Sequence, residues 1–128
     1  MNVQNEVNIC CKKLQMELKG LGIPKALYEA GITRLMNWSR TLSSSVDGWV
    51  SREKCSEAMI IRQKFQGELV QLKRFLRKDH RMYTPVVQAQ IERLEMVHKF
   101  FQHSLDKANH RYRREDEDLW YDFSGLPN

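Results

Sequence analysis

A stripe of regularly spaced apolar positions in the C-terminal half limits the fold more than any other feature of the sequence. Its members are Val87, Ile91, Leu94, His98, Phe101, Leu105, Ala108 and Tyr112. Alternating steps of 4 and 3 residues form a heptad repeat, the spacing of a helix that packs along its whole length at a shallow crossing angle. Val97 and Phe100 widen the apolar face. We therefore expect a helix over 85–114 that contacts more than one neighbouring helix.

Three earlier segments have the same helical periodicity and are separated by helix-breaking residues. Residues 3–19 carry Val3, Val7, Cys10, Leu14 and Leu18 on one face. Residues 24–45, opened by a proline suited to a first helical turn, carry Leu27, Gly31, Leu35, Trp38 and Leu42. Residues 51–79 carry Ala58, Ile61, Phe65, Leu69, Leu72 and Leu76. Because short connections make successive helices antiparallel neighbours, the sequence predicts an all-α, up-and-down four-helix bundle.

The side chains expected at the centre of this bundle come from all three longer segments. They are Leu35, Trp38, Phe65, Leu72, Leu94, Phe101 and Leu105. A length of 128 residues suits one domain, and 41% hydrophobic with 29% charged residues argues against general disorder. We expect a bundle domain over 1–114 and an acidic, aromatic C-terminal tail over 115–128.

The N-terminal residues and the overall hydropathy give an expectation for localisation. The first residues lack the basic and apolar regions of a signal peptide. No uncharged apolar run approaches the roughly 20 residues that a membrane-spanning helix needs. We therefore expect a cytoplasmic or nuclear protein that is not secreted.

The cysteines do not indicate a disulfide framework. Cys10, Cys11 and Cys55 are an odd number, and two adjacent residues point to different sides of a helix. The vicinal pair could sense oxidation or bind a soft metal, but no C-x-x-C motif is present. A small buried hydrophobic side chain at Cys10 is the favoured interpretation.

Motifs for catalysis or for a cofactor are weak throughout the chain. His103, Asp106 and His110 share one helical face, but the two imidazoles are two turns, ~10 Å, apart, too far for both to reach one metal easily. No nucleophile elbow or glycine-rich phosphate loop occurs. His98 interrupts an apolar stripe and is expected to be a hydrogen-bonded core histidine rather than a ligand or base, and burial could make its protonation pH-sensitive. The sequence predicts no enzyme activity, no metal and no cofactor.

Basic residues are expected to gather at one end of the bundle. In an up-and-down arrangement the first and third connections lie at the same end, so the residues near them should form a basic pole. These residues are Lys19, Lys25, Lys73, Arg74, Arg77, Lys78 and Arg81. Part of this clustering is explained by the favourable interaction of cations with a helix C-terminus. Tyr83, near the same pole, could stack on an unpaired base, although packing is the commoner role of such an aromatic.

Charge is divided unevenly along the chain. Residues 1–114 contain all 21 Lys and Arg but only 11 of the 16 Asp and Glu, a net charge of +10, and the remainder carries −5. The tail also contains the apolar side chains Leu119, Trp120, Tyr121 and Phe123. It could shield the basic surface, dock a partner through these side chains, or simply cap the end of the bundle.

Two functions from different classes follow from these patterns. The first is a non-catalytic accessory module in which the basic pole binds the phosphate backbone of nucleic acid or another polyanion, with a tail that modulates binding or docks a partner. The second is a protein-binding adaptor or inhibitor that acts through a helix face or the tail. Charge alone does not separate them, and oligomerisation is compatible with either.

Overall fold

The computed structural model describes the backbone of residues 3–46 and 52–124, and the side chains of residues 3–43 and 55–110. Within these ranges it contains α1 (Val3–Gly20), α2 (Glu29–Val46), α3 (Arg52–Arg77) and α4 (Pro85–Ser124), with the short 3-10 helix η1 (Lys25–Leu27) before α2. No strand occurs in this part of the chain. The predicted all-α class is confirmed.

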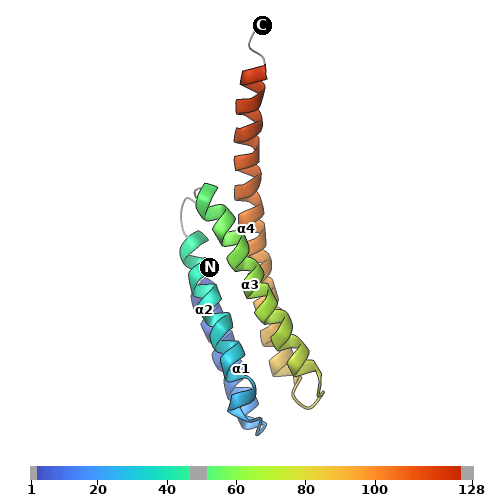
Figure 1. The fold of residues 1–128 in the computed structure, drawn as a ribbon. Helices are drawn as coiled ribbons and strands as arrows, with labels where there is room; N and C mark the ends of the chain where they lie inside the picture. The colour runs from blue at the N-terminus through green and yellow to red at the C-terminus, as the bar shows by residue number, and fades with distance from the viewer. Residues whose placement is uncertain (1–2, 47–51, 125–128) are drawn as a thin grey trace.

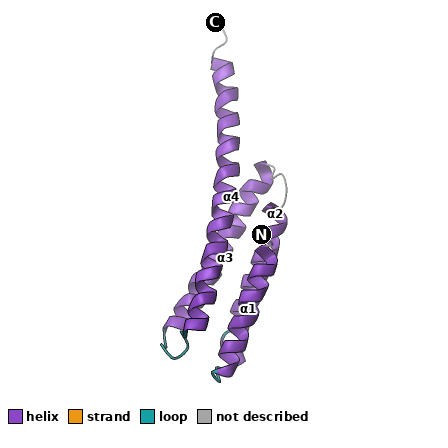
Figure 2. Cartoon of the chain, turned by 180° about the vertical axis from the view of Figure 1, so that it is seen from behind, coloured by secondary structure: helices purple, strands orange, loops and turns teal. Residues whose placement is uncertain are grey.

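The four α-helices form an up-and-down bundle. α1 packs against α2 and α4, and α3 packs against the same two helices, so the helices follow one another around the bundle in chain order. The α1–α2 and α3–α4 connections lie at the same end (Figures 1 and 2). There the Thr84 Oγ1 hydroxyl donates a 3.0 Å hydrogen bond to Glu17 Oε1, joining the end of α1 to the start of α4. The shared end is therefore fixed by a direct contact.

Local sequence signals explain where the helices at this end stop and start. Gly22 has φ 77°, a left-handed conformation that glycine adopts without strain. Gly22 N–H bonds to Lys19 O at 3.0 Å and Ile23 N–H bonds to Leu18 O at 3.1 Å, the two hydrogen bonds of a Schellman motif at the end of α1. Thr84 Oγ1 accepts the N–H of Val87 at 3.3 Å and caps α4, whose first residue is Pro85.

The core is built from the predicted stripes of α1, α3 and α4. Every apolar position predicted for residues 3–19 and 51–79 is buried, and so is the stripe of α4 from Val87 to Ala108. Phe65 and Phe101 are the largest fully buried side chains, and their rings meet edge to face with centroids 6.1 Å apart. Because each fully buried large apolar side chain contributes about 1.5–3 kcal/mol, this layer is a major source of stability.

The prediction for the second helix was wrong at its start. Residues 25–27 form η1 rather than the first turn of α2, so Leu27 is 59% exposed instead of buried. The buried face is Tyr28, Ile32, Leu35, Ser39 and Leu42. Trp38, predicted to be buried, is only partly buried against the edge of the core. The polar Ser39 is accommodated because its hydroxyl donates to Gln4 Oε1 on α1 at 3.0 Å and to Met36 O at 3.2 Å.

Two further expectations need correction. Phe100 was expected to widen the buried face of α4 but is 43% exposed, whereas Val97 is buried. The sequence predicted that the last helix ends near residue 114, and α4 instead continues to Ser124. It therefore extends beyond the other three helices as a single projecting helix (Figure 1). None of the described helices is both long enough and apolar enough to cross a membrane.

Candidate functional site

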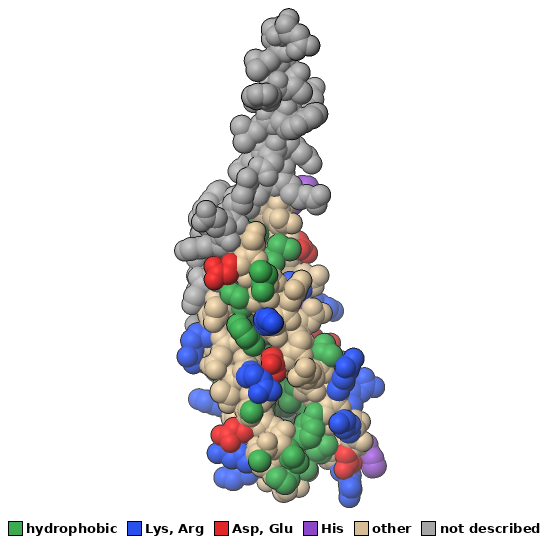
Figure 3. All heavy atoms as spheres, viewed as in Figure 1, with side chains coloured by type: hydrophobic (Ala, Val, Ile, Leu, Met, Phe, Trp, Pro, Cys, Tyr) green, Lys and Arg blue, Asp and Glu red, His purple; other side chains and the backbone are tan. Residues whose placement is uncertain are grey.

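The exposed face at the end of α3 is the strongest candidate site. Leu72 and Leu76 of α3 are buried, whereas Arg74 and Arg77 of α3 and Lys78, the residue after it, are exposed. These three cations, together with Lys73 and Val70, line a shallow open hollow. Lys and Arg side chains are also grouped at the corresponding end of the molecule in Figure 3. We call Arg74, Arg77 and Lys78 the basic sector.

Ion pairs divide the predicted basic residues into two groups. Lys73 Nζ lies 2.8 Å from Glu95 Oε1 on α4, and this hydrogen bond raises the pKa of Lys73. Arg81 lies 3.1 Å from Asp79, and its side-chain and backbone hydrogen bonds lower the pKa of the Asp79 carboxyl group. Lys25 is 3.4 Å from Glu29. These three cations already have an acidic neighbour, which reduces their attraction for an external anion.

The basic sector has no such neighbours. Among the described residues, Arg74, Arg77 and Lys78 form no ion pair. Lys19 is likewise exposed and unpaired, but it lies on α1, across the bundle from α3, and does not line the hollow. The structure therefore brings the cations at the end of α3 together. Lys19 and Lys25 lie at the same end of the bundle, but on α1 and η1.

Sequence reasoning missed the acidic partners of the predicted cations. Asp79 could have been found, because it is two residues from Arg81 in a turn. Glu95 could not, because its contact with Lys73 joins α3 to α4 across 22 residues of chain. The same pattern of pairing occurs elsewhere on the bundle, where Arg34 bonds to Glu68 at 2.9 Å and Arg93 bonds to Glu6.

His98 forms a second polar site, inside the bundle. Its side chain is 7% exposed, and its ring stacks on Phe65 with centroids 6.2 Å apart. Arg62 Nη1 lies 3.2 Å from His98 Nε2. Because a guanidinium group can only donate hydrogen bonds, Nε2 is the acceptor and the imidazole is neutral. Burial, and then the charge of Arg62, lower the pKa of His98.

This lowered pKa gives a prediction for the pH dependence of stability. The unfolded chain should protonate His98 near its ordinary pKa of 6.5, whereas the folded chain protonates it only at lower pH. Between these two pH values the unfolded state binds more protons, so the free energy of unfolding should fall as the pH is lowered, by at most about 1.4 kcal/mol per pH unit. Urea denaturation of the native protein at a series of pH values measures the slope.

His98→Gln provides the matched control, because its amide oxygen can still accept from Arg62 and its side chain does not titrate. The variant should lose part of the slope below pH 6.5, the ordinary pKa of His98. An identical slope in the two proteins would show that His98 does not contribute to it.

The cysteines and the possible metal ligands of the sequence are weaker candidates for a functional site than the basic sector. All three cysteines are buried, and burial raises the pKa of Cys11 to about 12. Burial also raises the pKa of Cys10, with a further contribution from Glu6. Neutral buried thiols are poor nucleophiles and poor metal ligands. Within the part of the chain that the structure describes, no three His, Cys, Asp or Glu side chains are grouped closely enough to hold a metal ion.

The predicted docking residues Leu119, Trp120, Tyr121 and Phe123 lie outside the described side chains. Only the helical backbone that carries them is described, as the last part of α4. This part of α4 leaves the bundle at the end opposite to the α3–α4 connection (Figure 1). The basic sector and the acidic segment are therefore at opposite ends of the molecule.

Comparisons with protein families, curated proteins and solved structures gave no match to this chain. The fold and the site define its class as an all-α, up-and-down helical bundle with a group of exposed cations at one end that form no ion pair with the side chains the structure describes.

Proposed function

We propose that the chain is a non-catalytic helical accessory module that binds nucleic acid through the phosphate backbone. The observation that carries this proposal is the basic sector, in which three adjacent exposed cations have no acidic partner among the described residues. Cations of this kind can each replace a condensed counterion on a phosphate backbone. The sector lies on the exposed side of the end of α3 and the residue that follows it, and would contact phosphates without reading base edges.

The course of α4 bears on the role of the acidic segment. A helix rises 1.5 Å per residue, so Glu115 lies roughly 45 Å along the axis from Pro85, where α4 starts beside the basic end. Shielding of the basic sector by the acidic segment of the same chain would require α4 to break. A segment that docks a partner requires no such change, and we favour that role.

The proposal is tested by binding of the intact protein to single-stranded and double-stranded oligonucleotides of mixed sequence. The logarithm of the association constant should fall linearly with the logarithm of salt concentration, with a slope of about −2 to −3 for three phosphate contacts, and it should depend little on sequence. Fluorescence anisotropy at several salt concentrations measures this slope. Absence of binding at low salt, or binding insensitive to salt, would exclude the proposal.

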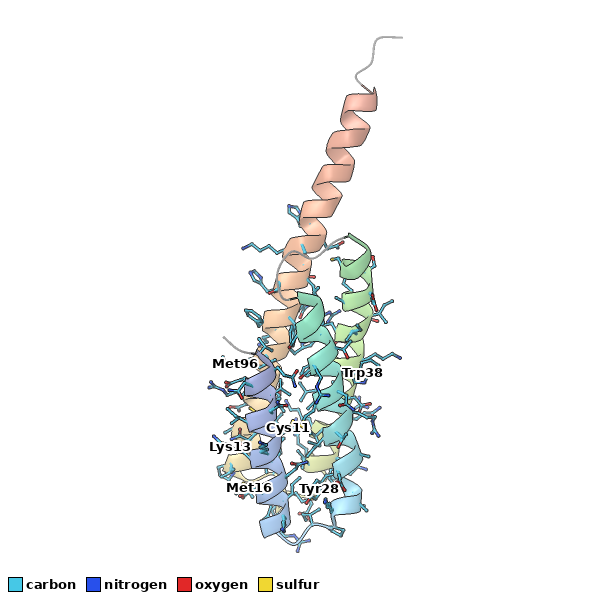
Figure 4. All side chains as sticks on the ribbon, turned by 90° about the vertical axis from the view of Figure 1, so that its left-hand side faces the viewer. Cys11, Lys13, Met16, Tyr28, Trp38 and Met96 are labelled. Atoms are coloured by element: carbon cyan, nitrogen blue, oxygen red, sulfur yellow. The ribbon has the colours of Figure 1, made fainter. Side chains whose placement is uncertain are left out.

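A specific observation supports a second candidate, the protein-binding adaptor. Met16 on α1 is 74% exposed and Met96 on α4 is 65% exposed, and Figure 4 shows both on the same side of the bundle, with Lys13 between them. Exposed methionines adapt to varied apolar partners. Replacing both by serine should leave nucleic-acid binding unchanged if the phosphate interaction is the main function, and should abolish partner binding if the adaptor function is correct.

A further inference from the structure

Among the residues that the structure describes, no other helix packs along the projecting part of α4. Cys55, near the start of α3, contacts α4 at Leu105, where its Sγ lies 4.0 Å from the carbonyl oxygen, and it forms a small buried cluster with Ala108. α3 begins only three residues earlier, at Arg52. From about residue 111 to Ser124, roughly 20 Å of α4 extends past the bundle (Figures 1 and 2).

A helical segment of this length gains little stability by itself. The bundle already nucleates α4, so the projecting segment is held by helix propagation alone, which is marginal because most helical stability in proteins comes from packing. The sequence of the segment also has apolar residues at helical spacing, since Leu119 follows Tyr112 by seven residues and Phe123 follows Leu119 by four. Such a segment is suited to packing against another helix.

The order of charges along the segment indicates which kind of partner helix would have complementary charges. Arg111, Arg113 and Arg114 precede an acidic block, Glu115 to Asp118, with no other residue between the two blocks. If two copies of this segment lie antiparallel and cross near residues 114 and 115, the basic block of each copy lies beside the acidic block of the other. In a parallel pair each block would lie beside the identical block of the other chain, and the like charges would repel.

We propose that this chain forms a homodimer through antiparallel pairing of residues 111–118, in the projecting part of α4, with the same residues of a second copy. The charge pattern is complementary to itself about a single point, which is what a twofold-symmetric interface requires. An unrelated acidic or basic partner would complement only one of the two blocks. This proposal is independent of the ligand bound by the basic sector.

Sedimentation analysis of the full chain at increasing concentration tests the dimer. The mass should rise from the chain mass of 15.2 kDa to twice that value. Reversing the basic block, by Arg111→Glu, Arg113→Glu and Arg114→Glu, should return the protein to monomer. Reversing the acidic block to lysine should do the same. An equimolar mixture of the two variants should recover the doubled mass, because one segment is then wholly acidic and the other wholly basic.

A matched control distinguishes the effect of reversing the basic block from the effect of changing the net charge of the chain. Lys12→Glu, Lys13→Glu and Lys99→Glu change the net charge as much as reversal of the basic block, at exposed positions within the bundle. This control should remain dimeric. A native protein that is monomeric throughout, or a dimer that persists in both block variants, would overturn the proposal. So would a control that dissociates as readily as the block variants.

The orientation of the pair is tested by disulfide formation. Glu115→Cys lies near the crossing point of an antiparallel pair and on the same helical face as Tyr112 and Leu119, so two copies should form a disulfide on mild oxidation. Phe123→Cys, on the same face, should not, because its two copies would lie about 25 Å apart along the axis. The native thiols should interfere little, since all three are buried. Efficient cross-linking through residue 123 would establish a parallel pair and contradict the proposed orientation, and absence of cross-linking through residue 115 would contradict the proposed crossing point.

Discussion

Phe101→Ala is expected to lower the free energy of unfolding by about 3–5 kcal/mol. The side chain is 1% exposed and belongs to the core cluster between α3 and α4, where its ring meets Phe65 edge to face at an interplanar angle of 77°. Truncation removes this contact and leaves a cavity between α3 and α4 that surrounding side chains can fill only in part. Small domains have a total stability of about 5–15 kcal/mol, so the loss is a large fraction of it.

Urea denaturation followed by circular dichroism measures this change as a lower midpoint with a similar slope. Phe100→Ala is the matched control, because it removes the same side chain from the adjacent position of the same helix. Phe100 is 43% exposed, and its truncation should cost much less than that of Phe101. Equal losses for the two variants would show that the packing of α4 differs from the one described.

Replacing Arg74, Arg77 and Lys78 together by glutamine should weaken binding to duplex nucleic acid by a few hundred-fold at about 0.1 M salt. Each phosphate contact contributes about 0.9 to the magnitude of the slope of log association constant against log salt. The contact therefore raises the association constant by about 0.9 log units when salt falls from 1 M to 0.1 M. Three lost contacts therefore reduce the affinity by about 2.7 log units and flatten the slope by the same number. Anisotropy titrations of the native and variant proteins measure both quantities.

The control for this experiment removes three other cations. Lys12, Lys13 and Lys99 are exposed and lie outside the basic sector, so their replacement by glutamine changes the net charge equally. If the sector binds phosphates directly, the control should lose far less affinity than the sector variant. Comparable losses would mean that overall charge, rather than this group of residues, determines binding.

The periodic stripes predicted most of the fold because each buried face follows from helical geometry alone. The stripes of α3 and α4 have large apolar residues at every inward position, so burial and helical propensity favour the same arrangement. The buried face of the second helix was harder to predict, because η1 shifts this face to Tyr28 and Ile32 and places Ser39 in it. A polar residue in a core face gives no apolar signal, and its partner Gln4 is 35 residues away.

Spacing within one helix placed the cations Arg74, Arg77 and Lys78 in adjacent turns of the candidate site. All three are exposed and line the same hollow, and their role as a binding site stays a prediction. The pairing of Lys73 with Glu95 depends on the rotation of α3 against α4, which periodicity defines only approximately. Electrostatic sites therefore need tertiary contacts before their free charges can be identified.

The length of α4 has a consequence for avidity if two copies pair as proposed. Lys73 bonds to Glu95, and α3 ends beside the start of α4 at Pro85, so the basic sector of each copy lies between the levels of these two residues on α4. Two such sectors would then be roughly 60–90 Å apart along a nearly continuous helical axis, about the length of 18–26 base pairs. A helical connection holds this spacing far better than a flexible linker does. A dimer could therefore act as a rigid spacer that favours two separate stretches of nucleic acid over two adjacent contacts on one short duplex.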